Sequence, residues 1–126
     1  MAHDTTEIYV RGLTEEDAAD WLRGVLGGLE KVQDAPIVTY EGQYEGDTVP
    51  VQITEQVRNR PYTSVWFNAP TPNLPWGSVS ECARAAHEAL GAEVLCYLDQ
   101  PEEPWLILRV AEGEAERVDE RNLDDF

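Results

Sequence analysis

The stretch SVSECARAAHEALGAEVLCYL, residues 78–98, reads as a helix followed directly by a strand. Ser78 and Glu81 have the spacing of a capping box, in which the serine accepts from the third amide and the glutamate reaches back to the Ser78 amide. Gly91 is typical of the residue that ends a helix. Because the apolar residues between these signals recur at helical spacing, we expect a helix that packs on a sheet through Val79, Cys82, Ala83, Ala86 and Leu90.

The preceding segment, NAPTPNLPWG at 68–77, connects this helix to a strand. Its three prolines stiffen the connection and lower the entropy cost of ordering it. Trp76 has two readings. It either folds over the helix end as a lid on the core, or it is an exposed aromatic anchor for a partner. The segment predicts a connector and no chemistry.

The N-terminal part of the chain shows the same order of strand and helix. Residues 6–12 alternate as a strand does, and residues 13–30 read as a helix with Thr14 as its N-cap and acids in its first turn. Pro50 favours an edge position or an irregular start for its strand. The other predicted strands are 36–42, 48–57, 62–68, 92–99 and 105–113.

The two parts of the chain align at an offset of 57 residues, so that Ile8 meets Val65 and Val51 meets Leu108. This spacing indicates either a duplicated β-α-β-β unit or a coincidence between regularly spaced elements. Both readings predict an α+β fold, with one antiparallel sheet of about six strands and two helices packed on one face.

Length and composition indicate one folded domain over residues 1–126, with 42% hydrophobic residues. Residues 112–126 form an acidic tail, which we expect to be either a short helix or a frayed end. The sequence contains no run of about 18 uncharged apolar residues, so it predicts no membrane span. The first residues lack the basic and apolar regions of a secretion signal, so we expect a cytoplasmic protein that contacts no membrane.

The charge balance is strongly acidic, with 25 Asp and Glu against nine Lys and Arg and a formal net charge of -16. Such a chain repels phosphates, so we expect no direct binding of nucleic acid. The acidity suits a basic protein partner, because complementary fields accelerate association. It also suits a salt-adapted, halophilic-type homodimer in which acidity serves solubility, or a solvated surface with no partner. Lys31 is the only lysine, which fits a salt-adapted cytoplasm or a high-GC genome.

No motif for catalysis, a cofactor or a metal stands out. His87 is a natural acid or base near neutral pH, but no nucleophile with a glycine elbow accompanies it, so we expect a structural histidine. Cys82 and Cys96 lie in apolar contexts and predict reduced core residues. Carboxylates are so numerous that their pairing is not an indication of catalysis. We therefore predict a protein without enzyme activity, cofactor or bound metal.

The face of the sheet that points away from the helices is the second informative surface. If Ile8 and Val10 face the helices, then Tyr9 and Trp66 face away, and Arg109 joins them in one register. A two-layer fold leaves this face open, where aromatic residues are typical of an interface. The alternative is that the acidic tail covers it within the same chain.

From Trp76 to about Glu116, the pattern of an Ala-rich helix, the pair Leu-Gly, a strand with Val and Cys, a turn and a final apolar strand covers about a third of the chain. This pattern resembles the C-terminal half of small acidic immunity-type proteins from bacterial toxin systems. The resemblance implies a non-enzymatic inhibitor that uses surface carboxylates and aromatic residues against a basic toxin or nuclease.

The sequence thus predicts a cytoplasmic, non-enzymatic protein that binds another protein, with homodimerisation of a salt-adapted protein as the alternative. The candidate contacts combine aromatic residues with the carboxylates of two turns, which would steer a basic partner. These residues are Tyr9, Trp66, Trp76, Glu41, Glu45, Asp47, Glu102 and Glu103.

Overall fold

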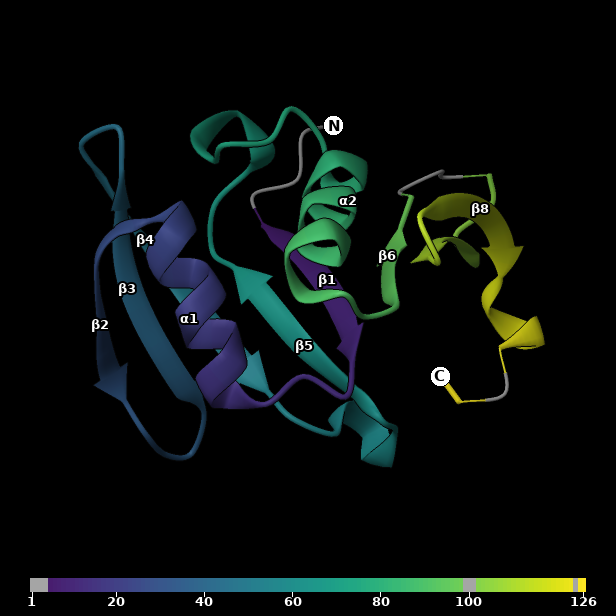
Figure 1. Cartoon of the computed structure of the whole chain (residues 1–126), viewed down its shortest axis with the longest axis horizontal. Coiled ribbons are helices and arrows are strands. Elements are labelled where there is room, and N and C mark those ends of the chain that lie inside the picture. The colour runs from purple at the N-terminus through teal and green to yellow at the C-terminus, as the bar shows by residue number, and fades with distance from the viewer. Residues whose placement is uncertain (1–4, 99–101, 124) are drawn as a thin grey trace.

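The computed structural model describes residues 5–98, 102–123 and 125–126. This described part contains one antiparallel sheet of eight strands and two α-helices, α1 (Glu15–Val25) and α2 (Val79–Leu90). Both helices lie on the same face of the sheet (Figure 1). The strand order is β2-β3-β4-β5-β1-β6-β7-β8. The strands are β1 (Thr6–Arg11), β2 (Gly27–Gln33), β3 (Val38–Tyr44), β4 (Asp47–Thr54), β5 (Tyr62–Phe67), β6 (Val94–Tyr97), β7 (Leu106–Ala111) and β8 (Glu114–Asp119).

The predicted α+β class, the antiparallel sheet and the two helices on one face are confirmed, but the described sheet has eight strands where about six were expected. The two additional strands, β2 and β8, are the two edges of the sheet. Most of their side chains are exposed or half-buried. Because these strands bury little apolar surface, they lack the hydrophobic alternation by which the other strands are recognised.

Strand β2 occupies the end of the segment that the sequence predicts as one helix over 13–30. The helix ends at Val25, and Leu26 is already extended, with φ −116° and ψ 143°. Gly28 then has a positive φ of 55°, which glycine adopts without steric cost. A Cβ on Gly42 of β3 would lie 2.6 Å from the Leu26 Cβ. Glycine at position 42 therefore permits the close approach of the helix end to the sheet.

The acidic tail was predicted as a helix or a frayed end, and both predictions are wrong for Glu114–Asp119, which form β8. A tight turn with positive φ at Glu112 and Gly113 joins β7 to β8, as hairpin connections of this kind require. A short 3-10 helix, η3 (Glu120–Asn122), follows. The described residues do not include Asp99 of the predicted strand 92–99, residues 100 and 101 of the turn after it, or Asp124 of the tail.

Pro50 does not mark an edge, because β4 lies between β3 and β5 in the interior of the sheet. The Pro50 carbonyl accepts from the Asn68 amide at 2.8 Å, just beyond Phe67, the last paired residue of β5. In a strand, the backbone nitrogen of a residue points to the same side as its carbonyl. The nitrogen of Pro50, which carries no hydrogen, therefore lies at the end of the ladder between β4 and β5. A proline is tolerated there because few hydrogen bonds remain to be made.

The two halves of the chain repeat the order strand, helix, strands, but the sheet itself is not two-fold symmetric. Strands β1 and β5 pair at the centre. On its other side β5 pairs with β4, whereas β1 pairs with β6. The offset of 57 residues matches β4 with β7 and β6 with β3, so the neighbours of the central strands are not equivalent. The alignment reflects a repeated order of elements and no two-fold arrangement of strands.

Both helix starts follow the predicted capping chemistry, with one difference. The hydroxyls of Thr14 and Ser78 each accept from the amide three residues later, at 3.2 Å. Glu81 reaches back to the amide of Gly77 at 2.7 Å, one residue before the predicted Ser78. Gly91 ends α2 in the left-handed conformation, as expected. Neither described helix is long and apolar enough to traverse a lipid bilayer.

The main core lies between the helices and the sheet. Cys82 of α2 and Cys96 of β6 are both fully buried in it and are not joined in a disulfide, and burial raises the pKa of the Cys82 thiol well above its usual range. Trp76 stacks on Trp21 at a ring distance of 5.7 Å and meets Phe67 edge-on at 5.4 Å. The Pro-rich segment thus connects β5 to α2, and its tryptophan closes one end of the core.

Candidate functional site

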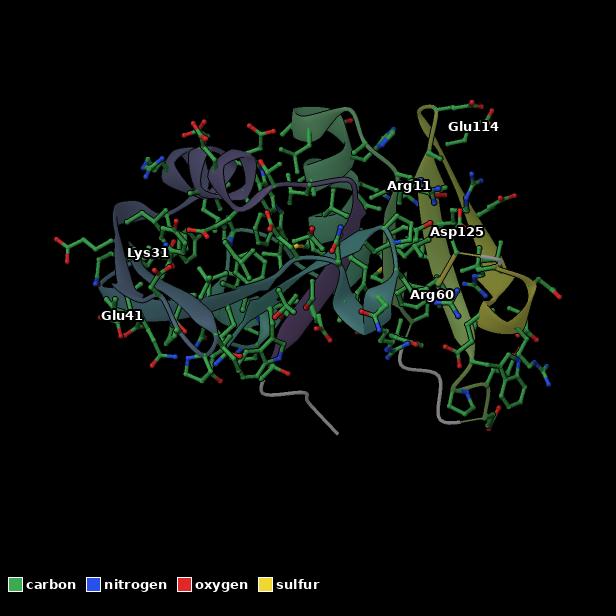
Figure 2. The ribbon with its side chains drawn as sticks, turned by 90° about the horizontal axis from the view of Figure 1, so that it is seen from below. Arg11, Lys31, Glu41, Arg60, Glu114 and Asp125 are labelled. Carbon is green, nitrogen blue, oxygen red and sulfur yellow. The ribbon has the colours of Figure 1, made fainter. Side chains whose placement is uncertain are left out.

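The outer face of the sheet, opposite the helices, carries the candidate site. Ile8 and Val10 lie in the helix-side core, so the alternation of β1 directs Tyr9 and Arg11 to the outer face. This face divides into two regions. The closed half lies over β1, β6 and β7, where the last residues of the chain pack on it. The open half lies over β3, β4 and the neighbouring part of β5, where no described helix or strand packs on it (Figure 2).

A cluster of aromatic rings forms the centre of the closed half. Tyr9 and Tyr62 are buried, and they pack together with half-buried Tyr97 around the ring of Phe126. Phe126 lies 4.8 Å from Tyr9, 5.5 Å from Tyr62 and 6.2 Å from Tyr97, measured between ring centroids. The guanidinium of Arg58 lies 5.2 Å above the same ring. We call the three tyrosines and Arg58 the aromatic cage.

Each tyrosine hydroxyl of the aromatic cage donates to a glutamate. Tyr9 donates to Glu7 at 2.8 Å. Tyr62 donates to Glu93, and Tyr97 donates to Glu120, each at 2.6 Å. Burial, together with the bond to Glu93, raises the pKa of Tyr62 to about 12. Burial is also the main cause that raises the pKa of both other tyrosines. The hydroxyls therefore stay protonated and hold the rings in place.

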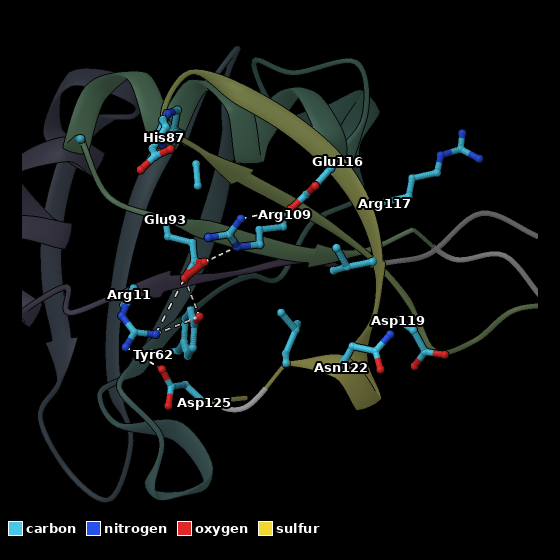
Figure 3. A pocket seen from close by; sticks show the side chains of 15 residues that line it. Arg11, Tyr62, His87, Glu93, Arg109, Glu116, Arg117, Asp119, Asn122 and Asp125 are labelled. Carbon is cyan, nitrogen blue, oxygen red and sulfur yellow. Dashed lines mark hydrogen bonds and ion pairs between the residues drawn. The ribbon is translucent and has the colours of Figure 1, made fainter.

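An arginine and glutamate network borders the cage. Glu93, whose side chain is only 14% exposed, lies between Arg109 at 2.5 Å and Arg11 at 3.8 Å (Figure 3). Arg109 also pairs with Glu116 at 3.1 Å, and Arg11 pairs with Asp125 at 2.7 Å. These residues line a shallow cavity of about 880 Å³ between the end of β1, β7 and β8. Both arginines that face one another across Glu93 are thus already paired with carboxylates.

His87 also borders this cavity, but its two ring nitrogens are both engaged. Nδ1 lies 2.8 Å from the carbonyl of Ala92, and Nε2 accepts from the backbone amide of Gly113 at 3.0 Å. This pair of contacts requires the neutral ring with its proton on Nδ1. The histidine therefore joins the end of α2 to the turn between β7 and β8. Its position agrees with the predicted structural role.

Charged side chains of the cavity form ion pairs with one another. Within the described residues, no group of three or more His, Cys, Asp and Glu side chains is arranged to hold a metal ion. Cys82 lies in the core away from the cavity.

No protein-family model, curated protein or solved structure matches this chain.

The open half has a different composition. The register of β3, β4, β5 and β1 places Thr39, Gln52, Trp66 and Glu7 side by side in one row across the outer face. Trp66 is half-buried in this row. The other outward residues of the open half are uncharged or acidic, and none is a cation. They are Glu41, Gln43, Thr48, Pro50, Thr54 and Ser64.

Two glutamates stand opposite each other at the border of the open half. Glu30 of the edge strand β2 pairs in register with Glu41 of β3. Like charges directly opposite on neighbouring strands destabilise a sheet. No ion pair between described residues involves either carboxylate. This pair is therefore a local cost to the fold that a positive group from outside would remove.

The structure separates the candidate contacts that the sequence predicted. Trp66 and Glu41 lie on the open half, and exposed Glu45 and Asp47 lie at the turn between β3 and β4. Glu102 and Glu103 are exposed beside β7, four strands away from β4. The eight predicted residues therefore do not form one continuous surface.

Two of the aromatic candidates serve the interior. Tyr9 is only 5% exposed under Phe126, so intramolecular cover, the alternative given for this face, describes its position. Trp76 is half-buried on the core.

The sequence reasoning missed Phe126 and the network around Glu93. Alternation in β1 placed Arg11 on the outer face, and one of the possible registers of β7 placed Arg109 there as well. No local pattern signalled that Phe126 folds back, because that contact joins residues 117 positions apart in the chain.

Proposed function

We propose that this protein is a non-enzymatic binding protein that docks a basic protein partner on the open half of its sheet. The observation that carries the proposal is the row around Trp66, where a half-buried tryptophan lies among polar side chains and carboxylates on a face that no described helix or strand covers. Tryptophan is among the residues that most often dominate binding energy. An inhibitor or immunity-type role, as the resemblance implies, is the form of this function that we favour.

Electrostatics supports a basic partner. The chain has a formal net charge of -16, and Glu30 opposes Glu41 beside the open half. A lysine or arginine of the partner placed between these carboxylates would replace their repulsion with two attractions. Such complementarity raises the association rate and makes it dependent on salt.

The experiment is an affinity capture from the native lysate with tagged protein at moderate and at high salt, read by mass spectrometry. We compare the wild type with Trp66→Ser and Glu41→Lys. The control is Glu114→Lys, which makes the same charge change on the far edge strand β8 (Figure 2). The wild type and the control should capture one basic protein in stoichiometric amount, and both open-half variants should lose it.

Loss of the captured protein at high salt from the wild type would support the charged contact. Equal capture by all four proteins would contradict the proposal. Recovery of the protein alone, as a dimer whose stability rises steeply with KCl, would favour the salt-adapted homodimer instead.

A further inference from the structure

The aromatic cage of the closed half holds a short peptide segment from its own chain. The ring of Phe126 fits between Tyr9 and Tyr62, while the carboxylate of Asp125 accepts from Arg11 at 2.7 Å. An acidic residue followed by an aromatic residue therefore pairs with Arg11 and fills the space between the tyrosine rings at the same time. The segment shows which ligand chemistry this part of the surface accepts.

The cage is built without help from the segment. The hydroxyls of Tyr9, Tyr62 and Tyr97 are fixed by Glu7, Glu93 and Glu120, and none of these bonds involves Asp125 or Phe126. The rings should therefore keep their positions when Phe126 leaves. A site that is already organised costs less to fill than one that must be ordered by its ligand.

Two arginines contact the segment, although the protein as a whole is strongly acidic. Arg58 lies over the ring of Phe126, and Arg11 faces Asp125. Arginines beside an aromatic site favour a segment that brings a carboxylate next to its ring. A ligand for the cage is thus acidic, unlike the basic partner of the open half.

The ion pair of the segment contributes little to holding it in place. The ion pair between Arg11 and Asp125 is exposed, with 42% and 52% of the two side chains accessible to solvent, and exposed pairs of this kind contribute little. An external segment of the same chemistry can therefore compete, although it must overcome the high effective concentration of a segment in the same chain.

We propose that the aromatic cage is a second docking site, which accepts an acidic-aromatic peptide segment of a partner protein, and that Asp125 and Phe126 are its intramolecular competitor. The site is separate from the row around Trp66, because its Tyr62 lies at the opposite end of β5 and because it binds the opposite charge. The protein would then expose the cage only when such a partner displaces its own residues.

The test uses a fluorescent peptide with the sequence DERNLDDF, that of residues 119–126, and measures its binding by anisotropy. Full-length wild type is compared with full-length Phe126→Ala, which empties the cage. We expect the variant to bind the peptide at least about tenfold more tightly than the wild type, since the competitor is lost. A peptide with alanine in place of its phenylalanine should bind neither protein.

Two further variants identify the cation. Adding Arg11→Gln to Phe126→Ala should weaken peptide binding severalfold. Adding Arg23→Gln, the same change on the exposed surface of α1, should leave it unchanged. If Phe126→Ala does not fold by circular dichroism, Asp125→Ala removes only the exposed ion pair and should still bind the peptide a few times more tightly than the wild type.

Equal peptide binding by the wild type and the folded variant, or no binding by either, would overturn the proposal and leave the segment as a fixed cover. Dimerisation of the wild type that Phe126→Ala abolishes would also overturn it, because the cage would then serve a second copy of this chain. Trp66→Ser and Glu41→Lys should not alter peptide binding, so failure here is separable from failure of the open half.

Discussion

The two halves of the outer face differ in how their charges and aromatic rings are satisfied. In the closed half, Glu93 is paired with two arginines and the tyrosine hydroxyls have carboxylate partners. In the open half, Trp66 has no described element over it, and Glu30 faces Glu41. Both halves belong to one sheet, so the contrast does not arise from strand geometry. One region is completed within the chain, and the other is the region on which we propose that a partner docks.

The strongest test of this comparison removes one aromatic residue from each half. Tyr62→Ala removes a ring that is 2% exposed and leaves Glu93 without its hydroxyl donor. We expect it to lower the free energy of unfolding by about 3 kcal/mol or more. Trp66→Ala should cost about 1 kcal/mol or less, because its ring is not enclosed. Urea unfolding of the two variants measures both values.

Equal losses of unfolding free energy in the two variants would show that Trp66 is part of the core. Trp66 would then not be a contact residue for a partner. This outcome would require a different anchor on the open half.

A pair of glutamate variants provides a second comparison. Glu93→Gln leaves Arg11 and Arg109 beside a neutral group in a partly buried site, and we expect a loss of about 2 kcal/mol. Glu41→Gln relieves the repulsion from Glu30, so it should be neutral or stabilise by up to about 0.5 kcal/mol. Thermal unfolding at neutral pH distinguishes the two signs. A destabilising Glu41→Gln would mean that this carboxylate has a stabilising role in the fold.

The third expected effect is the dependence of stability on alkaline pH. The pKa of Tyr62 is raised to about 12 in the folded protein, against about 10 in an unfolded chain. As pH rises from 10 to 12, the unfolded state loses this proton while the folded state keeps it. The free energy of unfolding should therefore fall across this window, by on the order of 1 kcal/mol for this residue.

Urea unfolding at pH 9, 10 and 11 measures this slope, and Tyr62→Phe is the variant to compare. The slope should be smaller in the variant, since one tyrosine of the closed half no longer titrates. An unchanged slope would show that Tyr62 does not contribute to it.

How far the fold was predictable depended on how much apolar surface each element buries. The interior strands and α2 were found because Val65, Phe67, Cys82 and Ala86 repeat with the period of their element. The edge strands were missed because Gly27–Gln33 and Glu114–Asp119 bury little. An edge strand pairs mainly through its backbone, and its side chains carry little trace of that pairing.

The candidate site was predictable only in part for a related reason. Alternation within β1 and β5 placed Tyr9 and Trp66 on the outer face without any long-range information. Which of them stays accessible depends on Phe126, whose contact with Tyr9 spans nearly the whole chain. Such a contact has no local signature, so the sequence left interface and intramolecular cover as two alternatives.

The most direct test of the central claim is to cross-link the captured partner to this protein with a zero-length carboxyl-to-amine reagent and to map the products by mass spectrometry. The account predicts that the partner's lysines are joined mainly to Glu30 and Glu41 beside the open half. Cross-links that fall mainly on Glu114 and Glu116 of β8, or on Glu102 and Glu103 beside β7, would contradict it.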